Sequence, residues 1–221
     1  MQAPCPPRYP SGMGKRQLAW VGGFVALAIA AGVGYAMVGA AQKRAQQRQV
    51  GQLVADSTER LRQALTAKAD TELVAAIDAN LKATRAPRDP ALADAAEQYI
   101  ISAREIAKRR IEVERLTRQA AASRAALAGH MTHAANRRGD AWMRDALALK
   151  KRVESDHFEL GITLKALYDL LYNLPDAEKR LEPRIGAALL LEPALTDSAR
   201  KQAQADGKRA ADELERARNI R

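Results

Sequence analysis

The chain has 221 residues, of which 4% are aromatic, and it carries a formal net charge of +10. About 180 residues remain beyond the N-terminal tail and one apolar segment, enough for one domain or a pair of small ones. The positive charge is dispersed in runs of mixed sign, which is typical of a solvated helical surface rather than a basic patch that binds nucleic acid. The single cysteine, Cys5, excludes an intramolecular disulfide and a cysteine-based zinc site.

The N-terminal part predicts a tail followed by a membrane anchor. Residues 1–16 are proline-rich, and we expect a disordered cytoplasmic tail. Residues 17–42 carry no charge, and Leu18 to Ala41 would form a helix about 36 Å long, enough to cross a bilayer core of about 30 Å. The residues expected at the two membrane interfaces are Lys15, Arg16, Trp20, Tyr35, Lys43 and Arg44. The alternative is a cleaved signal peptide, although its apolar region would be unusually long.

The composition and the flanking charges suggest where this anchor lies. Abundant alanine and arginine are typical of a GC-rich bacterial genome. Basic residues flank both ends of the apolar segment, but keeping the cationic tail inside is favoured by an inside-negative potential. We therefore expect a single-pass inner-membrane protein whose C-terminal domain lies in the periplasm.

Small residues recur along the predicted membrane helix. Gly22, Ala26, Ala30 and Gly34 lie four residues apart and would form a shallow groove on one face. Small residues let helix backbones approach closely inside lipid. This spacing predicts that the segment packs on a second helix, in a homo-oligomer or with a protein partner, although an alanine-rich chain also produces such ladders by chance.

The rest of the chain is predicted to be all-α. We expect membrane-proximal helices over residues 43–86, with Asp70 or Thr71 capping the second of them. A linker from Ala86 to Pro90 leads into a helical bundle predicted over residues 87–195. Asp89 should cap its first, long helix, whose apolar residues repeat every seven positions: Leu92, Tyr99, Ile106, Val113, Ala120 and Leu127. The second heptad seam is weak, which favours a long antiparallel helix in a bundle over an autonomous coiled coil.

The second half of the bundle is expected to consist of shorter helices. Asp156 followed by Glu159 resembles a capping box and predicts a helix start there. The predicted partner surface on that helix is Phe158, Leu164, Leu167, Tyr168 and Leu171. Pro175, Pro183 and Pro193 should then break the chain into short pieces. A polar helix is expected over residues 196–221, either loosely docked or free to meet a partner.

No residue pattern predicts a particular chemistry. His130 and His133 share a helix face and, with His157 and Asp140, could form a metal site, but the spacing differs from the metalloprotease HExxH motif. The Arg138-Gly139-Asp140 tripeptide is a chance-level match to adhesive ligands. The serines lack a nucleophile elbow, and no glycine-rich phosphate loop follows a strand. We expect no catalytic residues, no cofactor and no metal.

Three functional hypotheses follow. The first is a noncatalytic, membrane-tethered helical scaffold or adaptor in a bacterial envelope assembly, with the membrane and another protein or a second copy as partners. The second is a periplasmic ligand-sensing helical bundle, disfavoured because no second spanning segment connects it to an output. The third is a spanin-like lysis protein, which also pairs an anchor with a long helix but fits the proline breaks poorly.

Overall fold

The computed structural model describes the backbone of residues 15–67, 69–84, 89–133 and 139–219. It describes the side chains of these residues from Gly39 onward, except that of His133. All regular structure in this part of the chain is helical, which confirms the predicted all-α class. The chain divides into two compact units, Met1–Ala45 and Gln46–Arg221.

The first helix, α1, runs from Lys15 to Thr66 without interruption. The sequence contains no proline between these residues, and the helix continues past Gln42. Among the residues whose side chains are described, no helix is long and apolar enough to cross a bilayer. The side chains of most of the predicted transmembrane segment, Leu18 to Ala41, lie outside the described residues. Of the predicted tail, residues 1–16, the first 14 also lie outside them, whereas Lys15 and Arg16 belong to helix α1.

Two predicted helix caps are present in the structure. Helix α2 spans Thr71–Ala83, and the Asp70 carboxylate accepts a hydrogen bond from the Leu73 backbone N–H at 2.9 Å. Helix α3 spans Pro90–His133, and Asp89 accepts from the Leu92 backbone N–H at 3.1 Å. Both caps satisfy N–H groups that have no partner inside the helix.

Helix α4 corrects two predictions, because it is one helix from Asp140 to Ile185. Asp156 does not begin a helix. It lies in the middle of α4 and is buried, so the apparent capping box is a coincidence of sequence. Pro175 and Pro183 do not break the chain either. Each removes one backbone hydrogen bond, and the packing of Leu171, Leu174 and Leu181 in the core offsets that loss.

The chain ends in a docked helix rather than a free one. After α4, Gly186 adopts a φ of 91°, a left-handed conformation that favours glycine, and the short 3₁₀ helix η2 covers Ala187–Leu189. Helix α5 then spans Pro193–Arg218 and begins at a proline, as helices often do. Its buried residues recur every seven positions: Thr196, Ala203, Ala210 and Ala217. Small residues at this spacing let α5 pack closely on α4.

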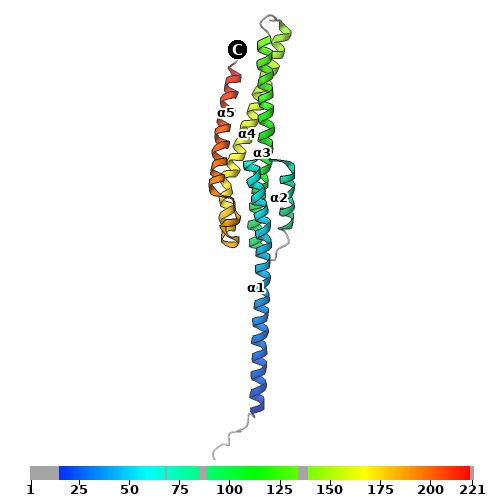
Figure 1. The fold of residues 1–221 in the computed structure, drawn as a ribbon, viewed down its shortest axis with the longest axis vertical. Coiled ribbons are helices and arrows are strands. Elements are labelled where there is room, and N and C mark those ends of the chain that lie inside the picture. The colour runs from blue at the N-terminus through cyan, green and yellow to red at the C-terminus, as the bar shows by residue number, and fades with distance from the viewer. Residues whose placement is uncertain (1–14, 68, 85–88, 134–138, 220–221) are drawn as a thin grey trace, which may run out of the picture. The chain divides into compact units, whose positions relative to one another are not determined.

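Within residues 46–221, the long helices α3, α4 and α5 run side by side in alternating directions, with α2 beside α3 (Figure 1). All six residues of the predicted heptad seam on α3 are buried, so that prediction is confirmed. Val50, Val54 and Leu61 from α1 lie in the same core cluster as residues of α2, α3, α4 and α5. Residues of 46–67 and 69–84 therefore share one core with residues of 89–133 and 139–219.

Candidate functional site

A buried polar contact centres on Thr58. The Thr58 hydroxyl of α1 lies within 2.8 Å of the Tyr99 hydroxyl and 2.9 Å of both the Val54 and Leu189 carbonyls. Thr58 has one proton to donate to a carbonyl, so Tyr99 donates its own proton to Thr58. Burial raises the pKa of Tyr99, which keeps this proton in place. The arrangement joins α1, α3 and η2 and is structural.

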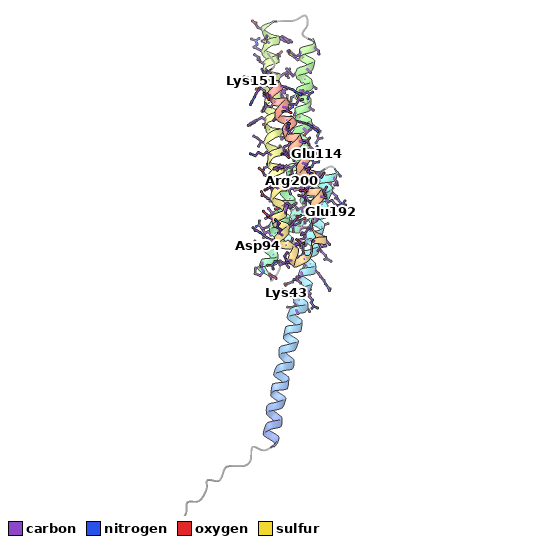
Figure 2. All side chains as sticks on the ribbon, turned by 90° about the vertical axis from the view of Figure 1, so that its left-hand side faces the viewer. Lys43, Asp94, Glu114, Lys151, Glu192 and Arg200 are labelled. Carbon is purple, nitrogen blue, oxygen red and sulfur yellow. The ribbon has the colours of Figure 1, made fainter. Side chains whose placement is uncertain are left out.

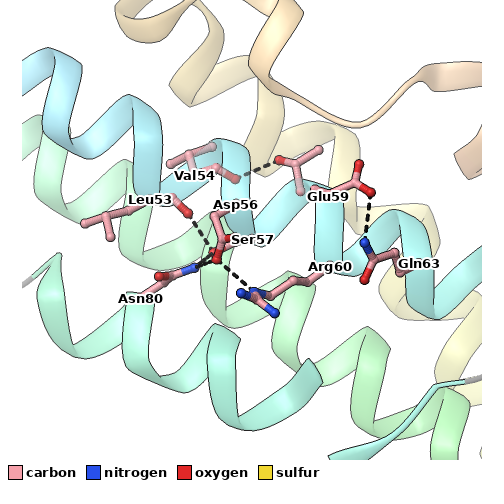
Figure 3. Close-up of polar contacts among 9 residues, drawn as sticks. Leu53, Val54, Asp56, Ser57, Glu59, Arg60, Gln63 and Asn80 are labelled. Carbon is pink, nitrogen blue, oxygen red and sulfur yellow. Dashed lines mark hydrogen bonds and ion pairs between the residues drawn. The ribbon is translucent and has the colours of Figure 1, made fainter. Parts of the chain in front are cut away.

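A second polar cluster joins α1 to α2 (Figure 3). Asn80 donates to the Asp56 carboxylate at 2.7 Å and to the Ser57 hydroxyl at 3.0 Å, and Arg60 donates to Asp56 at 2.8 Å. The hydrogen bond from Arg60 holds the pKa of Asp56 below its usual range. Every member has a partner, so this cluster positions α2 on α1 and leaves no group for chemistry.

An open cavity of about 260 Å³ lies among α3, α4 and α5 and is a candidate small-molecule site. Its polar lining consists of Thr117, Arg124, His157, Asp206, Arg209 and Glu213. Its apolar wall includes Leu160 and Leu164. A cavity with an apolar wall and a few polar groups is the usual form of a ligand pocket, although this volume is below the range of about 300–1,000 Å³ typical for drug-sized ligands.

His157 is the one buried imidazole in the lining of this cavity. Its Nδ1 lies 2.8 Å from the Val153 carbonyl, which can only accept, so Nδ1 carries a proton. In the neutral imidazole, Nε2 is then left as an acceptor. His157 can therefore accept a hydrogen bond from a ligand hydroxyl or amine.

The charged groups of the cavity are largely committed to one another. Arg124 pairs with Glu213 at 3.0 Å, and Arg209 pairs with Asp206 at 3.2 Å. Each pair has one well-exposed arginine, so the pairs form a solvated rim and contribute little to stability. The arrangement offers charged and polar groups that could hold a small polar molecule.

A buried carboxylate lies next to His157 in the sequence. Asp156 is 3% exposed, and its Oδ1 accepts a hydrogen bond from Gln119 on α3 at 2.6 Å. Its Oδ2 has no hydrogen-bond partner among the described residues. A buried unpaired acceptor is costly, and sequence reasoning missed it because the Asp156 to Glu159 pattern indicated an exposed cap.

The structure does not bring the candidate metal ligands together. His130 stacks on Trp142 with ring centroids 5.2 Å apart, and its Nε2 donates to the Trp142 carbonyl at 3.1 Å. His157 lies instead against the α3–α4–α5 cavity, and the side chain of His133 is outside the described residues. No group of three metal-ligating residues occurs in the described part of the chain.

The residues predicted as a partner surface lie in three environments. Leu164, Leu167 and Leu171 are buried in the core, Tyr168 is half-buried, and Phe158 is 55% exposed. The five therefore do not form one exposed surface. Exposed apolar residues of α4 that the sequence analysis did not select are Met143, Leu147, Ile162 and Tyr172. They lie on the same helix face as Phe158, and a helical wheel centred on Phe158 would have found them.

Of the residues predicted to lie in the membrane or at its interfaces, the structure describes only some side chains. Gly22, Ala26, Ala30 and Gly34, with Lys15, Arg16, Trp20 and Tyr35, lie in helix α1, but their side chains are outside the described residues. Lys43 and Arg44 are exposed on α1. Figure 2 labels Lys43 on this helix.

The protein is an all-α helical bundle. Polar clusters join its helices, and a cavity lies among three of them. Comparison of the chain with known protein families, with characterised proteins and with solved structures gave no match. Any functional conclusion therefore rests on the residues themselves.

Proposed function

We propose that the protein is a membrane-tethered helical scaffold, noncatalytic, in a bacterial envelope assembly. The observation that supports the proposal is the continuity of α1. One helix contains both the uncharged segment from Leu18 to Ala41 and the residues Val50, Val54 and Leu61, which are buried in the bundle core. A helix of this kind ties a folded bundle to a bilayer without an intervening linker.

The exposed apolar residues of α4 support the scaffold part of the proposal. Leu147, Phe158, Ile162 and Tyr172 are each at least half exposed on one helix. Exposed apolar residues gathered on one face mark protein contact sites more often than scattered ones do. A bundle that offers such a face while being anchored is suited to holding a protein, a second copy of the chain included, near the membrane.

The membrane anchor is tested by extracting membranes with alkaline buffer. The full chain should stay in the pellet, whereas a variant with Ile29→Arg and Val33→Arg should appear in the soluble fraction, since each arginine costs about 3 kcal/mol at the helix centre. The matched control, Ile29→Leu with Val33→Leu, should stay in the pellet. Release of the unaltered chain by alkali contradicts the anchor.

The orientation and the scaffold role need separate measurements. A phosphatase fused after Arg221 should be active if the bundle is periplasmic, and an inactive phosphatase with a bright fluorescent-protein fusion places the bundle in the cytoplasm. A tagged chain from mildly solubilised membranes should bring down a fixed set of envelope proteins, each of which recovers the chain in the reverse experiment. Recovery of the chain with no other protein contradicts the scaffold.

The cavity on α3, α4 and α5 favours a second candidate, a ligand-sensing bundle. The buried His157 beside Arg124 and Arg209 in the lining of the cavity is the observation behind it. Native mass spectrometry of the detergent-solubilised chain would show a bound small molecule, and that molecule should be lost from His157→Ala. An unliganded mass for the unaltered chain contradicts this candidate.

A further inference from the structure

The outward face of α4 carries a regular row of residues. Positions three or four apart fall on one stripe of a helix. The row consists of Arg144, Leu147, Lys151, Glu154, Phe158, Ile162, Lys165, Asp169, Tyr172 and Asp176. All are exposed except Glu154, which is half-buried. Figure 2 labels one of them, Lys151, on the long bundle. The row covers about 48 Å of helix at about 1.5 Å per residue.

The order of these residues is complementary to its own reverse. When the row is counted inward from its two ends, each basic residue is matched by an acidic residue, and each apolar residue by an apolar one. The pairs are Arg144 with Asp176, Leu147 with Tyr172, Lys151 with Asp169, Glu154 with Lys165, and Phe158 with Ile162. A second copy of α4 lying antiparallel on this face would bring each residue opposite its complement.

We propose that this face of α4 binds the same face of a second copy of the chain, antiparallel, about a two-fold axis between Phe158 and Ile162. A two-fold interface uses one patch twice, so a self-complementary row is the pattern that it requires. Parallel self-pairing would instead place Lys151 on Lys151 and Asp169 on Asp169. If a different protein bound this face, nothing would require the order of the residues in the row to be complementary to its own reverse.

The glycine beside the proposed axis is a second observation. Gly161 lies within α4 between Phe158 and Ile162, and a Cβ added there would meet nothing within 4 Å. Its backbone has no left-handed φ. Nothing in the single chain therefore requires glycine, which costs about 1 kcal/mol relative to alanine in a helix. A missing side chain at the crossing point lets a second backbone approach closely.

The charges of the row are available for such pairing. In the described part of the chain, Arg144, Lys151, Lys165 and Asp169 have no ion pair. Asp176 is paired only with Lys179, at 3.4 Å, and both side chains are more than two-thirds exposed. Exchanging that exposed pair for a contact with Arg144 of a second copy costs little.

The charge order is tested by a charge swap in the full chain, purified in mild detergent. Sedimentation should show a dimer. Lys151→Asp puts two acidic residues opposite each other at two symmetric places and should weaken dimerisation at least about tenfold. The double variant Lys151→Asp with Asp169→Lys restores opposite charges and should recover the dimer. The matched control is Arg152→Asp, an exposed charge on α4 outside the row, which should leave the dimer intact.

Disulfide formation tests the direction of the pair. In a chain with Cys5→Ser, a mixture of Phe158→Cys and Ile162→Cys chains should form a disulfide between the two variants faster than either forms one with itself. A preference for Phe158→Cys with itself contradicts the antiparallel arrangement. A dimer unaffected by Lys151→Asp, as self-association through the membrane helix predicts, or a chain that stays monomeric, overturns the proposal. The pairing uses only residues 144–176, so it does not depend on the membrane anchor.

Discussion

The two ends of the bundle are built differently. The end that contains α1 and α2 has a large core of aliphatic side chains around the fully buried Tyr99. At the other end only α3, α4 and α5 contribute, and the separate apolar cluster there consists of Leu127, Val153 and Ala217, with Leu149 packed against it. The first end can bury much more apolar surface, and each Å² contributes about 25 cal/mol.

Polar groups occupy part of the interior towards the three-helix end. Asp156 and His157 are both less than 10% exposed, and Asp156 has an unpaired oxygen. Buried groups of this kind cost free energy unless they are hydrogen-bonded. The five-helix end therefore has the larger apolar core, whereas the three-helix end has the smaller one and adjoins the cavity. Buried polar atoms without a partner occur at both ends, among them Glu178 Oε1 and Thr196 Oγ1 in the five-helix end. Substitutions at the two ends test how much each core contributes to stability.

The strongest test compares the same substitution in the two cores. Leu171→Ala lies in the large core at 0% exposure and should lower the free energy of unfolding by about 3–5 kcal/mol. Leu127→Ala, in the small cluster, should cost about 2 kcal/mol, because fewer contacts are lost. Urea unfolding of the full chain in mild detergent, followed by far-UV circular dichroism, measures both. Equal losses would show that the two ends are equally well packed.

The next largest loss of stability is expected from the polar contact between Thr58 and Tyr99 in the large core. Thr58→Val keeps the shape of the side chain but leaves the Tyr99 hydroxyl without its partner, and we expect a loss of about 2 kcal/mol. Thr58→Ser keeps the hydroxyl and should recover most of that loss. The same urea titration provides the measurement. A Thr58→Val chain as stable as the unaltered one would mean that water replaces the missing hydroxyl and that this core is not dry.

The smallest expected effect depends on pH. Burial raises the pKa of Glu178 to about 6, from a usual value of 4.5, against an opposing hydrogen bond from the Leu191 backbone. The folded chain therefore holds this proton more tightly than the unfolded chain, so the penalty for ionising Glu178 is present above pH 6 and disappears as the pH falls towards 4.5. Because Glu178 is only half-buried, the penalty should be below about 1 kcal/mol.

The variant Glu178→Gln removes this titration. Its melting temperature should exceed that of the unaltered chain at pH 7.5, and the difference should shrink at pH 5. Glu215→Gln, an exposed carboxyl on α5, serves as the control. A difference between Glu178→Gln and the unaltered chain that stays constant from pH 5 to 7.5 would contradict the burial of this carboxyl.

The sequence by itself determined the helical class and the strongest local signals. The seven-residue repeat from Leu92 to Leu127 predicted which face of α3 is buried, and Asp70 and Asp89 were predicted as caps. These signals are local, because they depend on residues within a few turns of one another. The prediction of a membrane segment also came from the sequence, from the absence of charge between Gln17 and Gln42.

Only the tertiary structure decided which apolar residues of α4 face the core. Leu164 and Ile162 are two residues apart and similarly apolar, yet Leu164 is buried and Ile162 is 55% exposed. The periodicity shows that a broad face is apolar, but α3 and α5 determine which part of it they cover. The predicted helix break at Pro175 and the predicted helix start at Asp156 were wrong for the same reason. A proline or a buried carboxylate inside a helix is unfavourable locally, and it is tolerated here because packing along the rest of α4 stabilises the helix.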